Sequence, residues 1–328
     1  MQACLLIPNK GARFHFGEAS DDYVNMPQAT SHFIHADTLF SAIVNAWVVK
    51  NPETVDEFIG ICKRGGFKIS SAFYCVETGG KIVFFLPKPV SLNLDPSKLE
   101  RIERIQMVSA GIWETGLHPR EWFDAKKCTL LQNETMVALK NEIDRSITLY
   151  EVVTTSKASI RTVDKEKASY FQTDLYLLGD ENHTVNWYFL MDNSLVGNLG
   201  NQLFEALQTM TVMGIGGKRS SGCGSLKGID FEEFSLKMSD TQYQVGISTV
   251  IPKVNELSDN CLYFTMKRGG RREGANEKPL PMVQVLQEGA VFDKDIKGQM
   301  VSLSENPPVF RYGINFSLPL HNNFIKGL

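Results

Sequence analysis

The 328-residue chain has no apolar run long enough to cross a bilayer, and no charged leader followed by an apolar stretch. These absences predict a cytoplasmic protein that makes no membrane contact. Its six cysteines include no C-x-x-C pair, so we expect no zinc site, redox dithiol or other metal site, and no cofactor. The formal net charge of −3 argues against non-specific duplex binding but leaves room for a local cationic groove.

What the chain does contain is typical of a globular α+β protein. Its residues are 43% hydrophobic and 22% charged, and the length suffices for two ordinary domains. Strands are predicted at Ala3–Ile7 and along the period-two run Phe310–Leu320, and a helix with an apolar face is predicted behind Asp37 as its N-cap. We place the domain boundary between residues 236 and 237, and expect strands with few helices in both parts.

Residues 214–224, here called the glycine loop, are the most informative stretch. Five of the eleven are glycines, which tolerate positive φ and let a backbone approach a ligand closely. Exposed backbone N–H groups in such a loop form an anion site, and cations and hydroxyls add further hydrogen bonds to phosphate oxygens. The predicted phosphate-binding residues are Gly214, Gly216, Gly217, Lys218, Arg219, Ser220, Ser221 and Gly222.

The spacing of the glycine loop excludes two common nucleotide sites. A Walker A loop fails because Val212 stands where its first glycine belongs and Arg219 where Ser or Thr belongs. The dinucleotide pattern G-x-G-x-x-G, started at Gly214, ends on Arg219. Both nucleotide loops also run from a strand into a helix. Here a helix capped by Ser194 is predicted before the loop and a strand, Ser225–Phe231, after it.

A polar arm is predicted from about residue 128 to residue 179, where core residues are sparse. Its segment Ser156–Lys167 carries four cations, tempered by two carboxylates. A chain that leaves the body and returns fits this pattern better than a packed domain. Contact with RNA and a solvated hairpin tip both stay open for its lysines.

Taken in order, these segments resemble one family. The matching pieces are Arg13–Glu18, His35–Ala42, Val163-Asp164 with Leu175-Tyr176, Gly214–Gly224, Glu288–Phe292 and Tyr312-Gly313. The chain resembles the RAMP-superfamily subunit of type III-A CRISPR (Csm) effector complexes that binds the 5′ end of the guide RNA. The subtype III-B counterpart stays open as a close relative.

The resemblance implies two ferredoxin-like (RRM-like) domains with antiparallel sheets, and a thumb-like β-hairpin inserted in the first domain at about 128–179. It implies that the glycine loop and thumb hold the repeat-derived 5′ handle of the crRNA. Candidate RNA contacts outside the loop are His35, Arg161 and Lys165. The expected partners are the large signature subunit, which carries polymerase and nuclease chemistry, and a neighbouring backbone RAMP subunit. The chain itself is then non-catalytic and acts in antiviral defence.

Two other function classes stay open. An RNA-cleaving enzyme would need a histidine base, for which His15, His32 and His35 are the N-terminal candidates, or clustered carboxylates such as Asp293 and Asp295. Spacing alone assembles no catalytic triad, so no catalytic residue is assigned. A purely protein-binding adaptor is the third hypothesis, and it predicts no contact with RNA.

Overall fold

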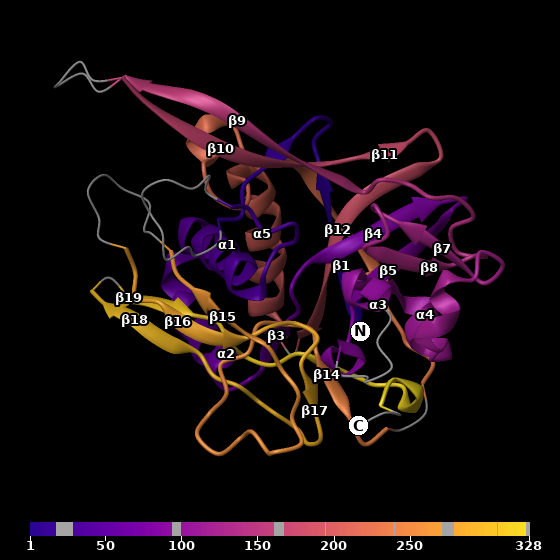
Figure 1. Cartoon of the computed structure of the whole chain (residues 1–328). Helices are drawn as coiled ribbons and strands as arrows, with labels where there is room; N and C mark the ends of the chain where they lie inside the picture. The colour runs from indigo at the N-terminus through magenta and orange to yellow at the C-terminus, as the bar shows by residue number, and fades with distance from the viewer. Residues whose placement is uncertain are drawn as a thin grey trace.

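A ten-stranded sheet dominates the computed structural model, which describes residues 1–17, 29–93, 100–160, 167–193, 195–238, 241–270, 279–306 and 308–325 (Figure 1). Its strands are β1 (Gln2–Pro8), β3 (Phe67–Ile69), β4 (Phe73–Thr78), β5 (Lys81–Pro87), β6 (Met107–Ser109), β7 (Cys128–Leu131), β8 (Met136–Leu139), β11 (Gly179–Asp180), β12 (His183–Asn193) and β13 (Leu226–Glu233). The order is β13-β1-β12-β4-β5-β6-β8-β7, with β3 and β11 also pairing β12. Only β6 and β8 pair in parallel among these strands, so the predicted α+β class with mostly antiparallel sheets is confirmed.

The middle of the sheet is held by aromatic side chains of β12. Trp187 is fully buried and packs edge-on against Phe14, with ring centroids 4.7 Å apart. Beside β12, the strands β4 and β5 form a hairpin whose turn residues, Gly79 and Gly80, have φ of 55° and 75°. Positive φ at both central residues matches the twist of a tight hairpin, so the glycines fix its register.

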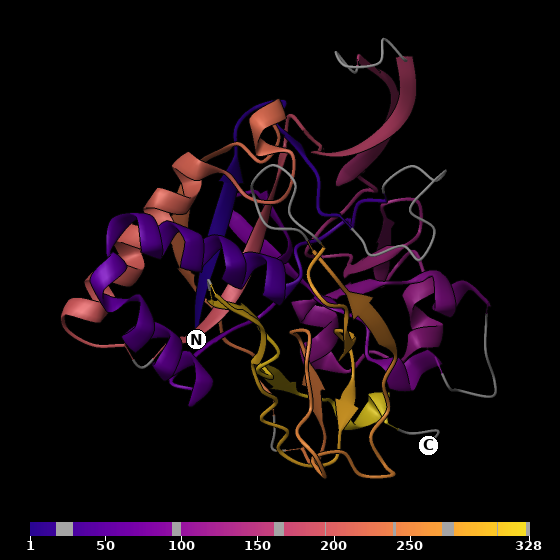
Figure 2. The ribbon, with the colours of Figure 1, turned by 90° about the vertical axis from the view of Figure 1, so that its left-hand side faces the viewer.

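Two helices, α1 (Ala36–Lys50) and α5 (Asn198–Met213), lie side by side on one face of the sheet (Figures 1 and 2). Next to α1 come the 3-10 turn η1 (Pro52–Thr54) and α2 (Val55–Lys63). The predicted start of α5 was wrong. The helix begins at Asn198 after Gly197, whose φ is 60°, which leaves Leu195 outside it, and Ser194 is not among the described residues.

Asp37 is not the N-cap of α1, because His35 occupies that position. Asp37 lies in the first turn with its side chain 1% exposed, and two arginines from the C-terminal part bind it. Arg268 donates from Nε at 3.0 Å and from Nη2 at 2.9 Å, while Arg311 donates from Nη1 at 2.6 Å. Burial opposes ionisation, but the two arginines outweigh it and hold the pKa of Asp37 far below its ordinary value.

A long antiparallel hairpin of β9 (Tyr150–Ile160) and β10 (Lys167–Leu177) projects from the body (Figure 1, top). Its base pairs with β2 (Arg13–Phe14). The hairpin thus starts at Tyr150, since the preceding β7 and β8 belong to the main sheet. Three short connections complete this part: α3 (Glu100–Arg104), α4 (Ala110–Thr115) and η3 (Pro119–Phe123).

The C-terminal part is built from small antiparallel sheets. These are β17-β14-β20, from Val291–Phe292, Gln244–Gly246 and Ser317–Pro319, and the pairs β15 (Thr265–Arg268) with β16 (Val283–Leu286) and β18 (Val301–Glu305) with β19 (Pro308–Arg311). The predicted strand Phe310–Leu320 is therefore split between β19 and β20. Between them Tyr312 stacks on Phe40 of α1, with centroids 4.7 Å apart, and its Oη accepts a hydrogen bond from the Ile69 amide at 3.0 Å.

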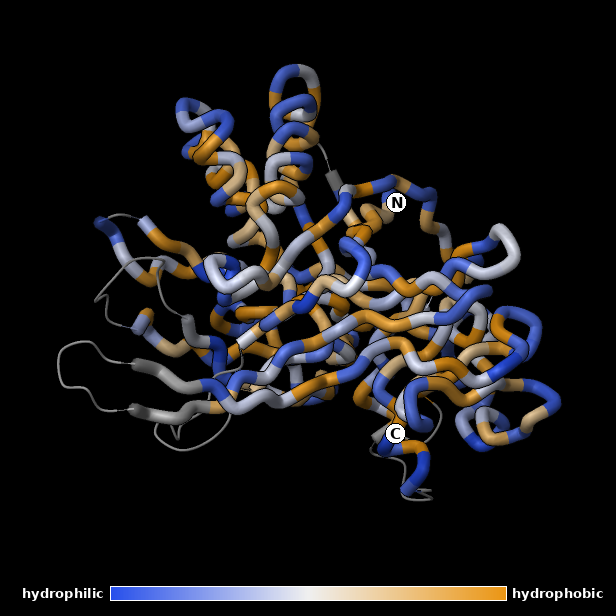
Figure 3. The backbone as a smooth tube through the Cα atoms, turned by 90° about the horizontal axis from the view of Figure 1, so that it is seen from above, coloured by the Kyte–Doolittle hydropathy of each residue, from blue (hydrophilic) through white to orange (hydrophobic). Residues whose placement is uncertain are grey.

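Both parts of the chain contribute to the main hydrophobic core, which runs from Ala3 to Phe324, and a second, smaller cluster lies in the C-terminal part. Figure 3 shows the apolar residues gathered in the central strands, while the peripheral turns are mainly hydrophilic. Among the described residues, no helix combines the length and apolar character needed to cross a membrane. The division at residue 236 stays a prediction.

Candidate nucleic-acid interface

The glycine loop connects the end of α5 to β13, so the predicted order of helix, loop and strand is confirmed. Gly214 leaves the helix with a φ of 77°, and Lys218 adopts the left-handed conformation with a φ of 56°. A single 3-10 turn, η4 (Arg219–Ser221), follows. This helix-to-strand placement differs from the geometry of nucleotide-binding loops, as the failed spacings predicted.

The glycines of this loop are needed because the loop packs closely on the protein's own backbone. The Gly217 amide donates to the His15 carbonyl and the Gly224 amide to the Arg13 carbonyl, both at 2.8 Å. A Cβ at Gly216 would lie 2.7 Å from the His15 carbonyl oxygen, and one at Gly224 would lie 2.2 Å from the Ile215 carbonyl oxygen. Gly216 thus allows the loop to dock on the segment 13–15, and Gly224 allows the close approach to Ile215 within the loop. Phosphate binding by Gly216 stays a prediction.

The docked loop presents its polar tip to solvent. Gly217, Ser220, Ser221 and Gly222 are exposed, while Lys218 and Arg219 are half-buried. Burial lowers the pKa of Lys218, and the nearby Lys157 lowers it further, against the opposing effect of Asp174. The structure thus brings the predicted residues 216–222 together at the tip of the loop, whereas Gly214 is buried.

A buried carboxylate, Asp174, organises the cations around this loop. The side chain is 2% exposed and lies on β10, with its Oδ2 3.5 Å from Nη1 of Arg13. Gln172 donates to Oδ1 of Asp174 at 2.6 Å, and Lys157 donates to the amide oxygen of Gln172 at 2.7 Å. Arg13 also donates to the Ser221 carbonyl. Three cations, Arg13, Lys157 and Lys218, therefore surround one carboxylate.

Besides Lys157 and Asp174, the sequence-based site prediction missed Arg13. It stands only two positions before His15, and its presence in the segment 13–18 was the one available signal. Its placement beside the loop depends on the pairing of β2 with β10, which joins residues more than 150 positions apart. Arg161 and Lys165, by contrast, lie outside the described residues.

His35 lies in a different cluster. It is 6% exposed, and its Nδ1 is 2.9 Å from Oε1 of Glu288. The Ser71 hydroxyl donates to the same oxygen. Burial raises the pKa of Glu288, but His35 and Ser71 outweigh that effect and bring it below its ordinary value. RNA contact by His35 stays a prediction.

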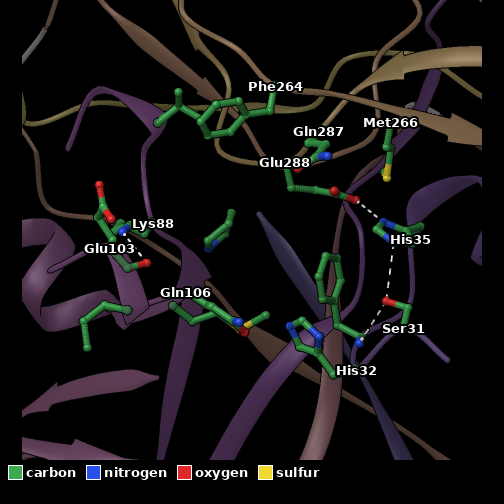
Figure 4. A pocket seen from close by; sticks show the side chains of 15 residues that line it. Ser31, His32, His35, Lys88, Glu103, Gln106, Phe264, Met266, Gln287 and Glu288 are labelled. Carbon is green, nitrogen blue, oxygen red and sulfur yellow. Dashed lines mark hydrogen bonds and ion pairs between the residues drawn. The ribbon is translucent and has the colours of Figure 1, made fainter. Parts of the chain in front are cut away.

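A pocket of about 330 Å³ opens beside this cluster, between the N-terminal and C-terminal parts (Figure 4). Figure 4 shows Phe264, Met266 and Gln287 on one side, with Gln106 and His32 opposite. Burial, together with the nearby His35, lowers the pKa of His32 to about 4, which keeps its ring neutral near pH 7. Within the described residues, no group of three or more His, Cys, Asp or Glu side chains is arranged to hold a metal ion.

Residues 239–320 match the family model described as the CRISPR Csm4 C-terminal domain. This chain is similar to the Csm4 proteins. The Csm4 protein of Methanocaldococcus jannaschii is 24% identical over 93% of this chain and 89% of its own length. The Csm4 protein of Thermococcus onnurineus is 24% identical over 86% of this chain and 90% of its own length.

Solved structures show the same fold. A chain in the crystal structure of the Csm3-Csm4 subcomplex of the type III-A CRISPR-Cas interference complex superposes with a TM-score of 0.70, at 18% identity, over 98% of this chain and 100% of that one. A chain in the Csm1-Csm4 cassette with pppApA gives 0.57, at 20% identity, over 98% and 97%. The predicted resemblance to the type III-A subunit is therefore confirmed.

Proposed function

We propose that this protein is a non-catalytic subunit of a type III-A CRISPR complex and holds the 5′ handle of crRNA. The observation that carries the proposal is the exposed tip of the glycine loop. Lys218 lies in this loop, and Arg13 and Lys157 lie beside it, next to the projecting hairpin. Docking on the large signature subunit and on a neighbouring backbone subunit follows from the partners of related Csm4 chains, which are solved with Csm1 and with Csm3.

The chemistry of the loop fits a single-stranded phosphate chain. Such strands are held by cations that follow the phosphates and by surfaces on which unstacked bases pack. The exposed Ser220 and Ser221 hydroxyls supply neutral hydrogen bonds beside Lys218 and Arg219. Although Asp174 and the Ser221 carbonyl both bind Arg13, its side chain is 31% exposed, which leaves it in reach of a phosphate.

Element order supports a ferredoxin-like first domain. The chain runs β1, α1, β4, β12, α5, β13, and the strands lie in the order β13-β1-β12-β4. This is the β-α-β-β-α-β arrangement. The β9–β10 hairpin, inserted before β12, is our candidate for the thumb. A second ferredoxin-like domain remains a prediction, since the described residues from 241 onward form strands and a 3-10 turn without an α-helix.

The contacts of the histidines favour a subunit without catalysis. Nδ1 of His15 lies 2.8 Å from the Thr173 carbonyl, and the ring is 4% exposed. His35 is likewise buried against Glu288. A general base must reach the proton it removes, and buried rings engaged in this way are poorly placed to do so. Specific scission of repeat RNA by the purified protein, lost on His35→Ala, would instead support the endoribonuclease hypothesis.

The test is the double charge reversal Lys218→Glu, Arg219→Glu, with Lys126→Glu as the matched control. Lys126 is exposed in the turn before β7. In the assembled complex we expect the double variant to bind intact-handle guides at least 10-fold more weakly, with a salt dependence reduced by about two phosphate contacts. The control should bind normally. Unchanged guide retention by the double variant would refute the proposal, and absence of any crosslink to handle RNA would favour the adaptor hypothesis.

A further inference from the structure

The pocket between the two parts of the chain has the walls of a site for a flat aromatic group. Phe264 and Met266 of its lining come from the C-terminal part, and Phe33 and His32 come from the N-terminal part. Phe264 is 47% exposed, although it is a large hydrophobic residue, so its ring is available at the pocket mouth. The backbone holds it in place, because the Gln287 amide donates to the Phe264 carbonyl at 2.9 Å.

A stack of rings beneath the pocket fixes the opposite wall. His32 stacks on Tyr150 with centroids 5.6 Å apart, and Tyr150 stacks on Tyr74 at 5.2 Å. The Tyr74 hydroxyl in turn donates to the His32 carbonyl. This arrangement holds His32 rigidly as a neutral ring that offers one donor and one acceptor.

The polar groups of the pocket suit a neutral ligand rather than a phosphate. Gln106 and Gln287 line it from opposite sides (Figure 4), and an amide both donates and accepts. One N–H of the Gln287 amide already donates to the Thr265 carbonyl at 3.1 Å, so its oxygen and second N–H are the groups left for a ligand. Lys88 donates to the Ile102 carbonyl at 2.5 Å, so its charge is already engaged by the protein. The carboxylates of Glu103 and Glu288 also line the pocket and would repel an anion.

The pocket and the glycine loop are joined by one short stretch of backbone. The His15 carbonyl accepts from Gly217 of the loop, and the next residue, Phe16, accepts at its carbonyl from Ser31 at 2.8 Å. Ser31 and its neighbour His32 line the pocket. The glycine loop and the pocket are therefore connected through hydrogen-bonded backbone at residues 15–16 and 31.

We propose that this pocket receives one unstacked nucleobase of the single-stranded handle RNA, between Phe264 and Met266 on one side and His32 on the other, with Gln106 and Gln287 at the edges of the base. The volume of about 330 Å³ lies at the small end of ligand sites, where a single base is accommodated. The inference rests on the proposed function for the source of the base. A free nucleotide shares the same ring chemistry, and the test separates the two sources.

The experiment compares Phe264→Ala and Gln106→Ala with the control Tyr263→Ala. Tyr263 is 39% exposed next to Phe264 but does not line the pocket. Guides are bound to the assembled complex with each handle nucleotide in turn made abasic. Stacking on an aromatic side chain predicts that Phe264→Ala weakens binding of the intact guide by about 5- to 100-fold. At one handle position, the abasic guide should show less than a 2-fold difference between Phe264→Ala and the unaltered protein.

The outcomes separate this inference from the proposed function. The base pocket would be overturned if Phe264→Ala weakened guide binding equally at every abasic position, or did not weaken it at all. This holds even where charge reversal at Lys218 and Arg219 still weakens guide binding. If the effect of Phe264→Ala disappears at one abasic position only, and the Lys218→Glu, Arg219→Glu variant binds guides normally, the result would support the base pocket and count against phosphate binding by the glycine loop. Saturable binding of AMP, GMP, CMP or UMP to the full chain, unaffected by handle RNA, would overturn the assignment of the base to RNA.

Discussion

The Asp174 carboxylate lies 3.5 Å from the Arg13 guanidinium, and this contact links the first segment of the chain to the projecting hairpin. The two residues sit on paired strands, since β2 faces β10 with Phe14 opposite Leu175. One partner is buried and the other is partly exposed. The buried carboxylate therefore positions a cation whose other face is turned to solvent.

Replacing Asp174→Asn should reduce the free energy of unfolding by about 1–3 kcal/mol, because Arg13 would lose the buried charge that compensates it. Urea denaturation of the purified chain measures this change. Asp259→Asn, at an exposed position, is the control and should alter stability by less than about 0.5 kcal/mol. Equal effects of the two substitutions would show that the carboxylate does not organise the cluster.

Two glycines of the loop differ in the space around them, and alanine variants can measure this difference. Gly224 and Gly222 have φ of 86° and 83°, so an alanine is strained at either position. Only at Gly224 would a Cβ also meet backbone, at 2.2 Å from the Ile215 carbonyl oxygen, whereas at Gly222 its nearest neighbour would be an Arg13 nitrogen 3.8 Å away. We expect Gly222→Ala to cost roughly 1–2 kcal/mol and Gly224→Ala clearly more, with weaker handle binding. Thermal unfolding compares the two, and similar costs would contradict the docked geometry of the loop.

Stability should fall with acidity well before the carboxylates titrate. The folded pKa of His32 is about 4, against an ordinary value of 6.5, so the unfolded chain takes up a proton first. The contribution of His32 is present above pH 6.5 and is lost as the pH falls toward 4, by about 3 kcal/mol in all. The pKa of His15 is also lowered, chiefly by burial, and acts in the same direction. Glu288, with its pKa below 4.5, loses its contribution only at lower pH.

Urea titrations between pH 5 and 7.5 therefore isolate the histidines. His32→Gln should flatten the pH dependence of the free energy of unfolding in this window. An unaltered slope in His32→Gln would mean that His32 is not held neutral by its surroundings.

Local patterns predicted the elements whose signals lie within a few residues. The strand around Ala3–Ile7, the helix predicted behind Asp37 and the order of helix, glycine loop and strand all follow from nearby spacing, and the structure confirms that these elements exist. The start of α5 was wrong because Gly197 ends the preceding turn with a positive φ. Asp37 was mistaken for a cap because the local sequence is the same whether the acid binds backbone amides or distant arginines.

The candidate site was only partly predictable for the same reason. The glycine loop could be recognised from the sequence because five glycines lie close together with cations between them. Arg13 and Asp174 become neighbours only through strand pairing, and the pocket lined by His32, Gln106 and Phe264 unites segments from three regions of the chain. No periodicity within one segment encodes such contacts, since they depend on how separate elements pack.

The ion pairs of Asp37 have a consequence for how this chain acquires its structure. Their partners follow 231 and 274 residues later, so most of the protein is synthesised before either arginine exists. Until then the first turn of α1 carries a hydrated carboxylate at a place that the finished protein encloses. Tyr312, which packs on Phe40 of the same helix, arrives equally late. A nascent chain ending at residue 236 would thus lack the groups that close over α1, and we expect its maturation to wait for the last strands to leave the ribosome.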